Sequence, residues 1–447
     1  MNNNSKNLQE GIQFKKLDLH VHTYKSYNDF ERDGVSDNDL QQLADKICQT
    51  AKDKGLSGIA ITDHNTGEAV DEIKTANEKL KTGLTIIPGT EVDVFEGFHV
   101  ICLFPNKTTS AQIRDWLIGL GMDASNIGKT DFAPSKNTTL QAVRESVDKL
   151  NGLMVAAHAD SSNQSLFSAK KSSGSKFVEG KMDVAKFDAI ETKNIQRLKS
   201  NYSQFIEGYA IYQASDNHRQ NQDGTQGKHC YSTIGEPYTW FKLDEISVDG
   251  LRQCFIDPEV RIKQIDEWKP EMLDGVPRIL SLEIKTKNGF FADGEKFIFN
   301  TDINSFLGGK GAGKSLVLEY LRFVLNDIAN DDYIKQDSVY KLIATLGCGG
   351  KVIIQVQTEH GDIYVFAREF DPKKISEPVI TRGQKLTPEL CERIFASSQT
   401  SVASKDGVLK PNLDARQLFP IVAYSQTEIF TLARDKQSQL KSIKPSF

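Results

Sequence analysis

The 447-residue chain has few cysteines and no long apolar run. Its six cysteines are scattered without a Cys-x-x-Cys pair, which disfavours a disulfide scaffold and a zinc–thiolate site. No apolar stretch approaches the roughly 20 residues that a membrane-spanning helix needs, and the polar start MNNNSKNLQEG lacks the apolar centre of a signal peptide. These absences predict a cytoplasmic protein with reduced thiols and no membrane partner.

The chain also lacks a strong charge of either sign. Its 55 Lys and Arg residues stand against 60 Asp and Glu residues, so the net charge is −5 and does not by itself indicate a nucleic-acid-binding protein. The charge is uneven, because basic residues outnumber acidic ones by 23 to 20 from Arg278 onward, whereas the preceding part is acidic. The length allows two or three domains. The acidic excess indicates either a solvated surface or carboxylates gathered around metal cations.

Residues 14–262 show an alternation of strands and helices. The segment 36–55 has the apolar spacing of an amphipathic helix, and the apolar strand LSGIAITDH follows it. Repeated units of this kind are typical of a parallel sheet that is closed or doubly wound. In a barrel, the carboxyl ends of the strands converge and carry the active site. Eight polar residues fall at such ends: His20, His22, Asp63, His64, Glu91, His158, Asp216 and His218.

Histidines dominate this set, and His99 in a further strand adds a sixth imidazole. A single histidine is more often a core or surface residue than a ligand. Six imidazoles with three carboxylates are hard to explain as core, because buried polar groups need partners. Imidazole and carboxylate ligands suit zinc, manganese or iron, and so many ligands predict a cluster of two or three divalent ions.

The motifs DLHVHT, ITDH, PGTEV, AAHAD and ASDNH resemble those of the PHP (polymerase and histidinol phosphatase) metallophosphoesterases. The resemblance covers roughly residues 14–262 and implies an α/β fold, a distorted (β/α)7 barrel. It implies one ion held by His20, His22, Glu91 and Asp216, and a second held by Glu91, His99 and His158. A third ion would use His64, His218 and an acidic residue after the first motif. That residue is Asp29 of SYNDF, with Asn28 as the alternative because the spacing is one residue longer than usual.

The resemblance implies hydrolysis by metal-activated water. Closely spaced divalent ions lower the pKa of a bridging water and bind the oxygens of a phosphate, so no protein nucleophile is required. His20, His22, Glu91 and Asp216 would serve catalysis through the ions, and Asp63 would orient a neighbouring ligand. Arg219 is either a phosphate-binding residue or an ordinary surface arginine.

A second motif, GGKGAGKS at 308–315, satisfies the phosphate-loop pattern GxxxxGK[ST]. It is expected to follow an apolar strand and to open the helix SLVLEYLRFVLN, so that backbone N–H groups surround the phosphates, Lys314 neutralises charge and Ser315 binds Mg²⁺. The sequence therefore predicts an ATP–Mg²⁺ site that includes the whole loop: Gly308, Gly309, Lys310, Gly311, Ala312, Gly313, Lys314 and Ser315.

The surroundings of this loop resemble the N-terminal lobe of SMC/RecN-like ABC ATPases. Gln426 in YSQTEI resembles the glutamine that reaches Mg²⁺ and the attacking water. An LSGGQ-like signature and a Walker B acidic pair are missing from the sequence, so we expect a C-terminal lobe or a partner subunit to supply them, oligomerisation through the ATPase heads, and slow ATP turnover without that partner.

The predicted organisation is a tail at 1–13, a barrel at 14–262, a charged linker at 263–277 and an ATPase lobe at 278–447. This order resembles TrlF-like PHP–ATPase proteins, some of which are associated with bacterial anti-phage defence. It implies a nuclease that acts on nucleic acid, DNA above all, and is gated by ATP. Two alternatives stay open: a small-molecule or nucleotide phosphatase with a nucleotide-sensing lobe, and a DNA-binding clamp with an inactive barrel.

Overall fold

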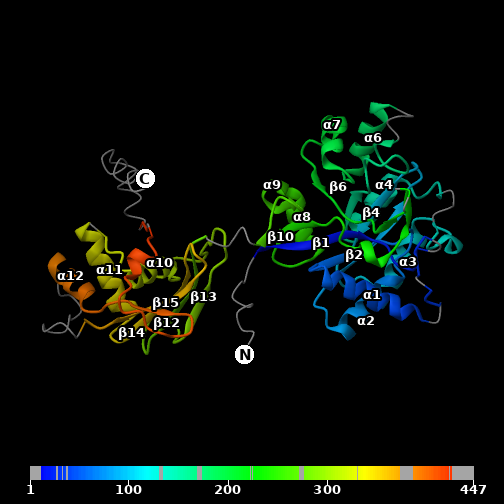
Figure 1. Cartoon of the computed structure of the whole chain (residues 1–447). Helices are drawn as coiled ribbons and strands as arrows, with labels where there is room; N and C mark the ends of the chain where they lie inside the picture. Colours follow the sequence, from blue (N-terminus) through cyan, green and yellow to red (C-terminus); the bar gives the residue numbers. More distant parts are fainter. Residues whose placement is uncertain are drawn as a thin grey trace. The chain divides into compact units, whose positions relative to one another are not determined.

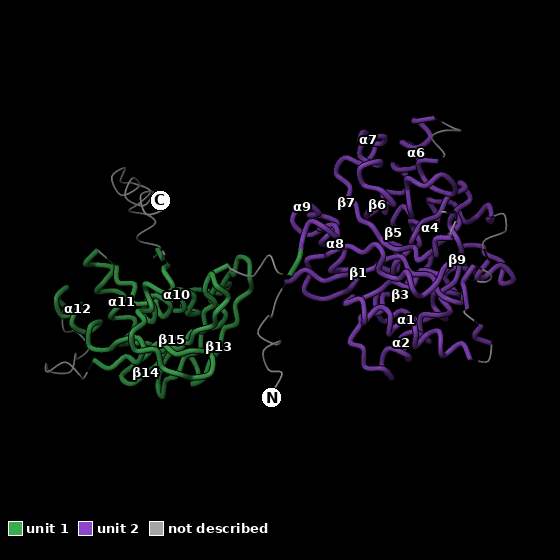
Figure 2. Tube along the Cα trace, viewed as in Figure 1, with its two compact units in different colours: residues 1–10, 269–447 green, residues 11–268 purple. Residues whose placement is uncertain are grey.

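The computed structural model describes residues 12–424 apart from 27–28, 33, 37–38, 130–133, 169–173, 222, 224, 271–275, 330, 373–385 and 422. The described residues divide into two compact units, one that ends at Trp268 and one that begins at Lys269 (Figures 1 and 2). The division falls inside the segment 263–277 that the sequence predicts to be a linker. Among the described helices, none combines the length and the apolar composition that a membrane crossing requires.

The first unit is built on a nine-stranded sheet. Its strands, in sheet order, are β11 (Ile262–Gln264), β10 (Thr239–Leu243), β1 (Gln13–Val21), β2 (Gly58–Ile61), β3 (Thr85–Asp93), β4 (His99–Leu103), β5 (Leu153–Ala156), β6 (Ala189–Glu191) and β7 (Ala210–Tyr212). Its helices are α1 (Leu40–Asp53), α2 (Ala69–Leu80), α3 (Ser110–Gly119), α4 (Leu140–Lys149), α6 (Ser175–Ala185), α7 (Ile195–Ile206), α8 (Val248–Ile256) and α9 (Pro258–Arg261).

The sheet curls until its two ends nearly meet. The Gln264 side-chain amide, on β11, donates a hydrogen bond of 3.2 Å to the carbonyl of Ile211 on β7. The result is a mixed α/β unit with a nearly closed barrel. The predicted all-parallel arrangement is wrong in two places: β4 runs antiparallel to β3 and β5, and β10 runs antiparallel to β1 and β11. The connection from β3 to β4 is only a short turn, and a parallel crossover needs a dozen or more residues.

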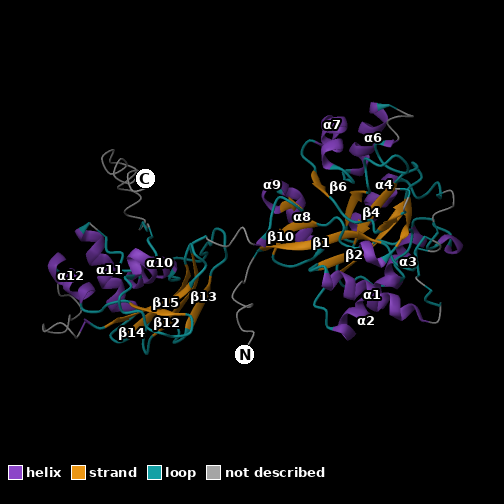
Figure 3. Cartoon of the chain, in the orientation of Figure 1, coloured by secondary structure: helices purple, strands orange, loops and turns teal. Residues whose placement is uncertain are grey.

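Apolar burial explains why the strands and helices of this unit assemble. Strand β2 is buried at all four positions, as expected for a strand covered on both faces. Helix α1 buries residues at helical spacing, among them Leu43, Ile47 and Ala51, and packs beside α2 on the outside of the barrel (Figure 3). These contacts fix the positions of the strand ends, and therefore the positions of the polar residues that follow the strands.

The second unit is a five-stranded antiparallel sheet covered by helices. Its strands, in sheet order, are β13 (Glu295–Ile298), β12 (Arg278–Lys285), β14 (Gly350–Gln357), β15 (Ile363–Phe370) and β16 (Ser401–Ser404). Its helices are α10 (Lys314–Val324), α11 (Asp332–Thr345), α12 (Pro388–Ala396) and α13 (Ala415–Leu418). Residues of α10, α11, α12 and the central strands form an apolar core within this unit.

Candidate metal centre

Strands from across the first unit deliver the predicted ligands to one rim of the barrel. His20 lies near the end of β1, His22 directly after it, and Glu91 near the end of β3. His64 follows β2 and forms an isolated β-bridge with Glu91. His99 is the first residue of β4, and because β4 runs antiparallel, its start lies at the same rim as the carboxyl ends of its neighbours.

Two ligand candidates adopt left-handed backbone conformations. His158, just after β5, has φ +26°, and Asp216, after β7, has φ +45°. Non-glycine residues in this region cost of order 1–3 kcal/mol, and such residues cluster at functional sites. The Asp216 N–H donates to the carbonyl of His20 at 3.0 Å, which holds the turn against β1. The strained turns keep both side chains at the rim rather than along the strands.

Glu91 lies at the centre of the cluster, and its two oxygens face different imidazoles. Oε1 lies 3.1 Å from His99 Nδ1 and 3.1 Å from His158 Nε2. Oε2 lies 3.5 Å from His20 Nε2, 3.3 Å from His22 Nε2 and 3.0 Å from His64 Nδ1. The carboxylate is 1% exposed, so these nitrogens replace water around it. This is the arrangement expected of a carboxylate that bridges two ions.

The predicted first set has the spacing of metal ligands. His20 Nε2 lies 2.9 Å from His22 Nε2, and the two nitrogens lie 3.6 Å and 3.4 Å from Asp216 Oδ1. A tetrahedral ion with ligand distances of about 2.1 Å separates its ligands by about 3.4 Å. His20, His22 and Glu91 therefore fit one ion, as do His64, Glu91 and His99, which also offer ligand atoms within 4.8 Å of one another.

Several buried atoms of the cluster make no hydrogen bond although a possible partner is close. His64 Nδ1 and Glu91 Oε2 are both in this position, 3.0 Å apart. The oxygen does not lie along the direction of the ring nitrogen, which suits lone pairs that converge on a shared cation. Buried polar atoms without partners cost about 1–3 kcal/mol each, so the residues present fit divalent metal ions better than a polar core.

Second partners fix the orientation of the imidazoles. Glu191 Oε2 lies 2.8 Å from His20 Nδ1, and Asp93 Oδ1 lies 2.7 Å from His99 Nε2. Ser26 Oγ donates a hydrogen bond of 2.7 Å to Asp63, and the same Ser26 Oγ lies 3.0 Å from the Nδ1 atom of His22. Asp63 therefore acts on a ligand through Ser26, as metal-site carboxylates commonly do.

The electrostatics of the cluster favour cations. Burial opposes ionisation of Glu91, but the neighbouring imidazoles, His99 foremost, outweigh it and hold the pKa of this carboxyl well below its usual value. Burial likewise opposes ionisation of Asp216, but nearby cations, Lys193 foremost, hold its pKa well below its usual value. Burial lowers the pKa of His64 well below its ordinary value, so its imidazole is neutral and able to coordinate.

A cavity of about 580 Å³ opens over the cluster. It is lined by the candidate ligands Asp29, His64, Glu91, His99, His158, Asp216 and His218, and by Ser161–Gln164, Lys193, Gln226, Gly227 and Lys228. Ser161–Gln164 belong to the Ser-rich segment after the AAHAD motif. Arg219 is not among these lining residues, and its Nη1 lies 2.6 Å from Glu31 Oε1. Lys193 faces the cluster, with Nζ 2.6 Å from Asp216 Oδ2.

The third predicted set lies around a two-stranded sheet of β8 (His218–Gln220) and β9 (Gln226–His229). Among the described residues its three members do not form a group with all ligand atoms within 4.8 Å of one another, whereas His218 forms such a group with Asp216 and His229. Asp29 lies 4.0 Å from His64 Nε2 through its Oδ2 atom, whereas Asn28 lies outside the described residues. His229, which none of the five motifs contains, lies against this set. The sequence signal was weak, because GKHC resembles none of the five motifs, although the residue is only eleven positions after His218.

The glycine-rich loop 308–315 ends at α10, as predicted. Gly311 and Gly313 have φ of +83° and +86°, and a Cβ on Gly313 would lie 2.7 Å from the Phe290 ring. Lys314 Nζ donates to the carbonyls of Gly308 and Gly309 at 2.7 Å and 2.8 Å. The expected strand directly before the loop is absent from this described segment, because β13 ends at Ile298. Gln426 lies outside the described residues.

A comparison with protein families covers most of the barrel unit. Residues 18–210 match the model of the PHP domain. The family resemblance predicted from the motifs is confirmed over this range, which holds seven of the nine predicted metal ligands; Asp216 and His218 lie beyond it.

A curated relative and two solved structures are similar to parts of the chain. The uncharacterized protein MJ1587 of Methanocaldococcus jannaschii is 34% identical over 93 residues, which are 21% of this chain and 52% of that protein. The chain thus spans about half the length of this relative.

An endonuclease Q, solved with a 27-mer duplex that has an abasic lesion at the active site, gives a TM-score of 0.40 at 19% identity. The match covers 57% of this chain and 59% of the endonuclease Q chain. A candidate metal-dependent phosphoesterase of Bifidobacterium adolescentis gives a TM-score of 0.33 at 17% identity. This match covers 49% of this chain and 94% of the phosphoesterase chain.

Proposed function

We propose that the barrel unit is a metal-dependent phosphodiesterase that cleaves nucleic acid with metal-activated water. The observation that carries the proposal is Glu91, a buried carboxylate whose two oxygens face two different groups of imidazoles. A carboxylate placed between imidazoles in this way would suit a site for two or three ions of manganese, zinc or iron. When bound, such ions lower the pKa of a coordinated water and offset the charge on the phosphate oxygens.

The side chains around the cluster have distinct roles in this reaction. The first ion would be held by His20, His22, Glu91 and Asp216. The second ion would be held by Glu91, His99 and His158. Glu191 orients His20 from behind. Lys193 places a positive charge at the cavity wall beside Asp216, where it would contact a phosphate oxygen. Arg219 is less well placed to contact a phosphate oxygen, because it is paired with Glu31.

The lining of the cavity supports a nucleic-acid substrate. Two lysines, Lys193 and Lys228, and the hydroxyl and amide side chains of Ser161–Gln164 surround the candidate ligands. Phosphate contacts from such groups bind a nucleic-acid backbone without reading its sequence. One observation favours the alternative of a nucleotide or small-molecule phosphatase: the cavity volume of about 580 Å³ is within the range of small-ligand sites, about 300–1,000 Å³.

We further propose that residues 308–315 bind ATP and Mg²⁺ and that nucleotide binding gates the barrel. The positive φ of two glycines and the start of α10 at Lys314 support a phosphate-binding turn at a helix N-terminus. Lys314 would exchange its two carbonyl contacts for the phosphates. The resemblance to TrlF-like proteins supports three further parts of this proposal. These are the gating, the supply of the missing ATPase motifs by a C-terminal lobe or partner, and a role in anti-phage defence.

A substrate comparison tests this function. We expect the manganese-loaded full chain to cleave labelled single-stranded DNA, duplex DNA or RNA internally or from an end, and the His20→Ala, His22→Ala double variant to be inactive. His360→Ala, which changes an exposed histidine of the second unit, is the matched control. Release of inorganic phosphate from mononucleotides without cleavage of any polymer would favour the phosphatase instead.

A further inference from the structure

His229 is buried at the end of β9, yet neither of its ring nitrogens makes a hydrogen bond with a described residue. Its exposed fraction is 0%. Burial removes water from both nitrogens. The Asp29 carboxylate approaches Nε2 to 3.2 Å, but Nδ1 has no partner at that distance, and an unpaired buried polar atom costs about 1–3 kcal/mol. An apolar side chain would avoid that cost, so packing alone does not account for a histidine at this position.

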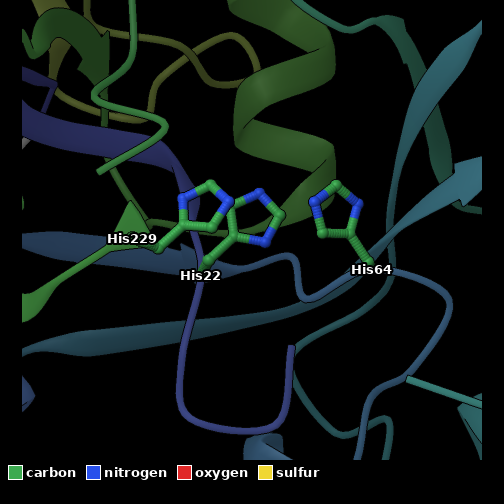
Figure 4. Close-up of side chains that lie close together, drawn as sticks. All are labelled: His22, His64 and His229. Atoms are coloured by element: carbon green, nitrogen blue, oxygen red, sulfur yellow. The ribbon is translucent and has the colours of Figure 1, made fainter. Parts of the chain in front are cut away.

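The ring of His229 lies among predicted metal ligands. Its centroid is 3.9 Å from that of His22 and 3.7 Å from that of His218. His229 Nε2 lies 3.2 Å from Asp29 Oδ2, and its Nδ1 lies 3.8 Å from Asp216 Oδ1. Figure 4 shows the rings of His22, His64 and His229 side by side, and ligand atoms of these three residues lie within 4.8 Å of one another.

The backbone holds this arrangement together. The N–H of His229 donates to the carbonyl of Asp29 at 2.9 Å, and the N–H of Glu31 donates to the carbonyl of His229 at 2.8 Å. His218 and His229 are directly paired across the β8–β9 hairpin. Three potential ligands, Asp29, His218 and His229, are therefore positioned by one small set of hydrogen bonds outside the nine-stranded sheet.

We propose that His229 is a ligand of the third ion, together with Asp29, His218 and His64, and that this ion fastens the β8–β9 hairpin to the barrel. The inference rests on the proposed metal centre and adds to it a ligand from outside the five motifs. His218 Nδ1 lies 2.7 Å from the carbonyl of Gly227, which leaves Nε2 for the ion. The Asp29 and Asp216 carboxylates supply the negative charge that a divalent ion requires.

The hairpin also forms part of the cavity wall. Gln226, Gly227 and Lys228, which precede His229, line the cavity over the cluster. An ion bound to His218 and His229 would order this wall, whereas the first two ions would depend only on residues of the main sheet and its loops. Occupancy of the third position therefore couples metal binding to the shape of the substrate cavity.

The test is a Mn²⁺ titration of the metal-stripped full chain, with free Mn²⁺ counted by electron paramagnetic resonance. We expect three bound ions in the wild type. In His229→Ala, the affinity for one ion should fall about tenfold or more, in line with the effect of weakening a metal site, while the other two stay within twofold. His229→Asn keeps polarity and some volume, and should behave alike. His360→Ala should match the wild type.

A second readout separates loss of a ligand from loss of the fold. Circular dichroism of the metal-free variants should match that of the metal-free wild type, and Mn²⁺ should slow hydrogen exchange of residues 218–229 in the wild type but not in His229→Ala. A folded His229→Ala or His229→Asn chain that binds three ions with unchanged affinity would overturn the proposal. So would a wild type that binds fewer than three. Three bound ions without any phosphoester cleavage would instead contradict the proposed function alone.

Discussion

At the scale of single residues, Glu91 and Lys193 are the two side chains on which the proposed site most depends. Glu91 was predictable, because a glutamate at the end of an apolar strand in PGTEV matches a known motif. Lys193 was not, since a lysine one turn after a strand is ordinary in any sequence. Only the fold brings its Nζ atom to 2.6 Å from Asp216 Oδ2. Arg219 directly follows the ASDNH motif, yet its side chain pairs with Glu31.

Lys193 supports a prediction about substrate binding. Burial opposes its charge, but Asp216 and Glu191 outweigh this effect and raise the pKa of Lys193, so the ammonium group stays charged at neutral pH. Lys193→Ala should lower kcat/KM for phosphodiester cleavage by about tenfold or more, because one charge-assisted contact contributes about 1.5–3 kcal/mol. Lys193→Arg should retain part of the activity.

The control is Lys228→Ala, which removes an exposed lysine from the same cavity wall. We expect it to change kcat/KM by less than about threefold, as surface ion pairs contribute about 0–1 kcal/mol. Steady-state kinetics at full manganese occupancy measures both. Equal losses in the two variants would show that the cavity attracts substrate through diffuse charge rather than through Lys193.

At the scale of helices and strands, the sequence predicts the elements better than their directions. The apolar runs and helical periodicities of residues 14–262 locate the strands and helices well, because both depend on local pattern. The antiparallel course of β4 depends on the short connection 94–98, whose Gly97 adopts φ +87° in a tight turn. The β8–β9 hairpin was missed because HRQ and QGKH lack the apolar alternation of a core strand.

Arg368 on β15 ties together helices of the second unit and supports a stability prediction. It is 2% exposed, and its guanidinium donates to the carbonyls of Phe323 at the end of α10, of Phe395 at the end of α12, and of Ser398. Burial lowers its pKa to about 10, so it remains charged at neutral pH. Cations at helix C-termini are stabilising, and Arg368→Ala should cost about 3 kcal/mol or more by leaving buried carbonyls unpaired.

Urea denaturation of the full chain, followed by a probe in the second unit, measures this cost. Arg416→Ala, which removes a mostly exposed arginine of the same unit, should change the free energy of unfolding by less than about 0.5 kcal/mol. If Arg368→Ala unfolds at the same urea concentration as the wild type, the three carbonyls are satisfied without the arginine, and its role in joining the helices is wrong.

At the scale of the whole molecule, the two units have separate cores and separate candidate sites. The apolar clusters of the barrel contain residues up to Ile262, and the cluster of the second unit begins at Leu282. The sequence predicted a boundary here from composition alone, since the charged segment 263–277 interrupts the alternation. It also predicted that these candidate metal ligands lie close together, whereas the approach of Glu91 to two sets of imidazoles depends on the closure of the barrel.

Separate sites predict separable defects. Lys314→Ala should weaken ATP binding by about 1.5–3 kcal/mol, the contribution of a charge-assisted phosphate contact, and leave nucleic-acid cleavage without ATP unchanged. The His20→Ala, His22→Ala double variant should lose cleavage and keep ATP binding. If nucleotide gates the barrel, ATP should alter the cleavage rate of the wild type but not that of Lys314→Ala.

Lys310→Ala is the control for the loop, because Lys310 is exposed and occupies a variable position of the GxxxxGK[ST] pattern. Fluorescence titration with a labelled ATP analogue measures affinity, and it should fall much less in this variant than in Lys314→Ala. An unchanged affinity in Lys314→Ala would show that residues 308–315 do not bind phosphate.

The central claim is that the ions held at the barrel rim perform the cleavage, and a manganese titration of activity tests it most directly. The chain is stripped with chelator, dialysed, and assayed on a labelled oligonucleotide as Mn²⁺ is added in steps up to full occupancy. We predict no cleavage by the stripped protein, and a cleavage rate that rises with occupancy and is absent in the His20→Ala, His22→Ala double variant. Cleavage that survives complete stripping, or that never appears on any phosphodiester at full occupancy, would contradict it.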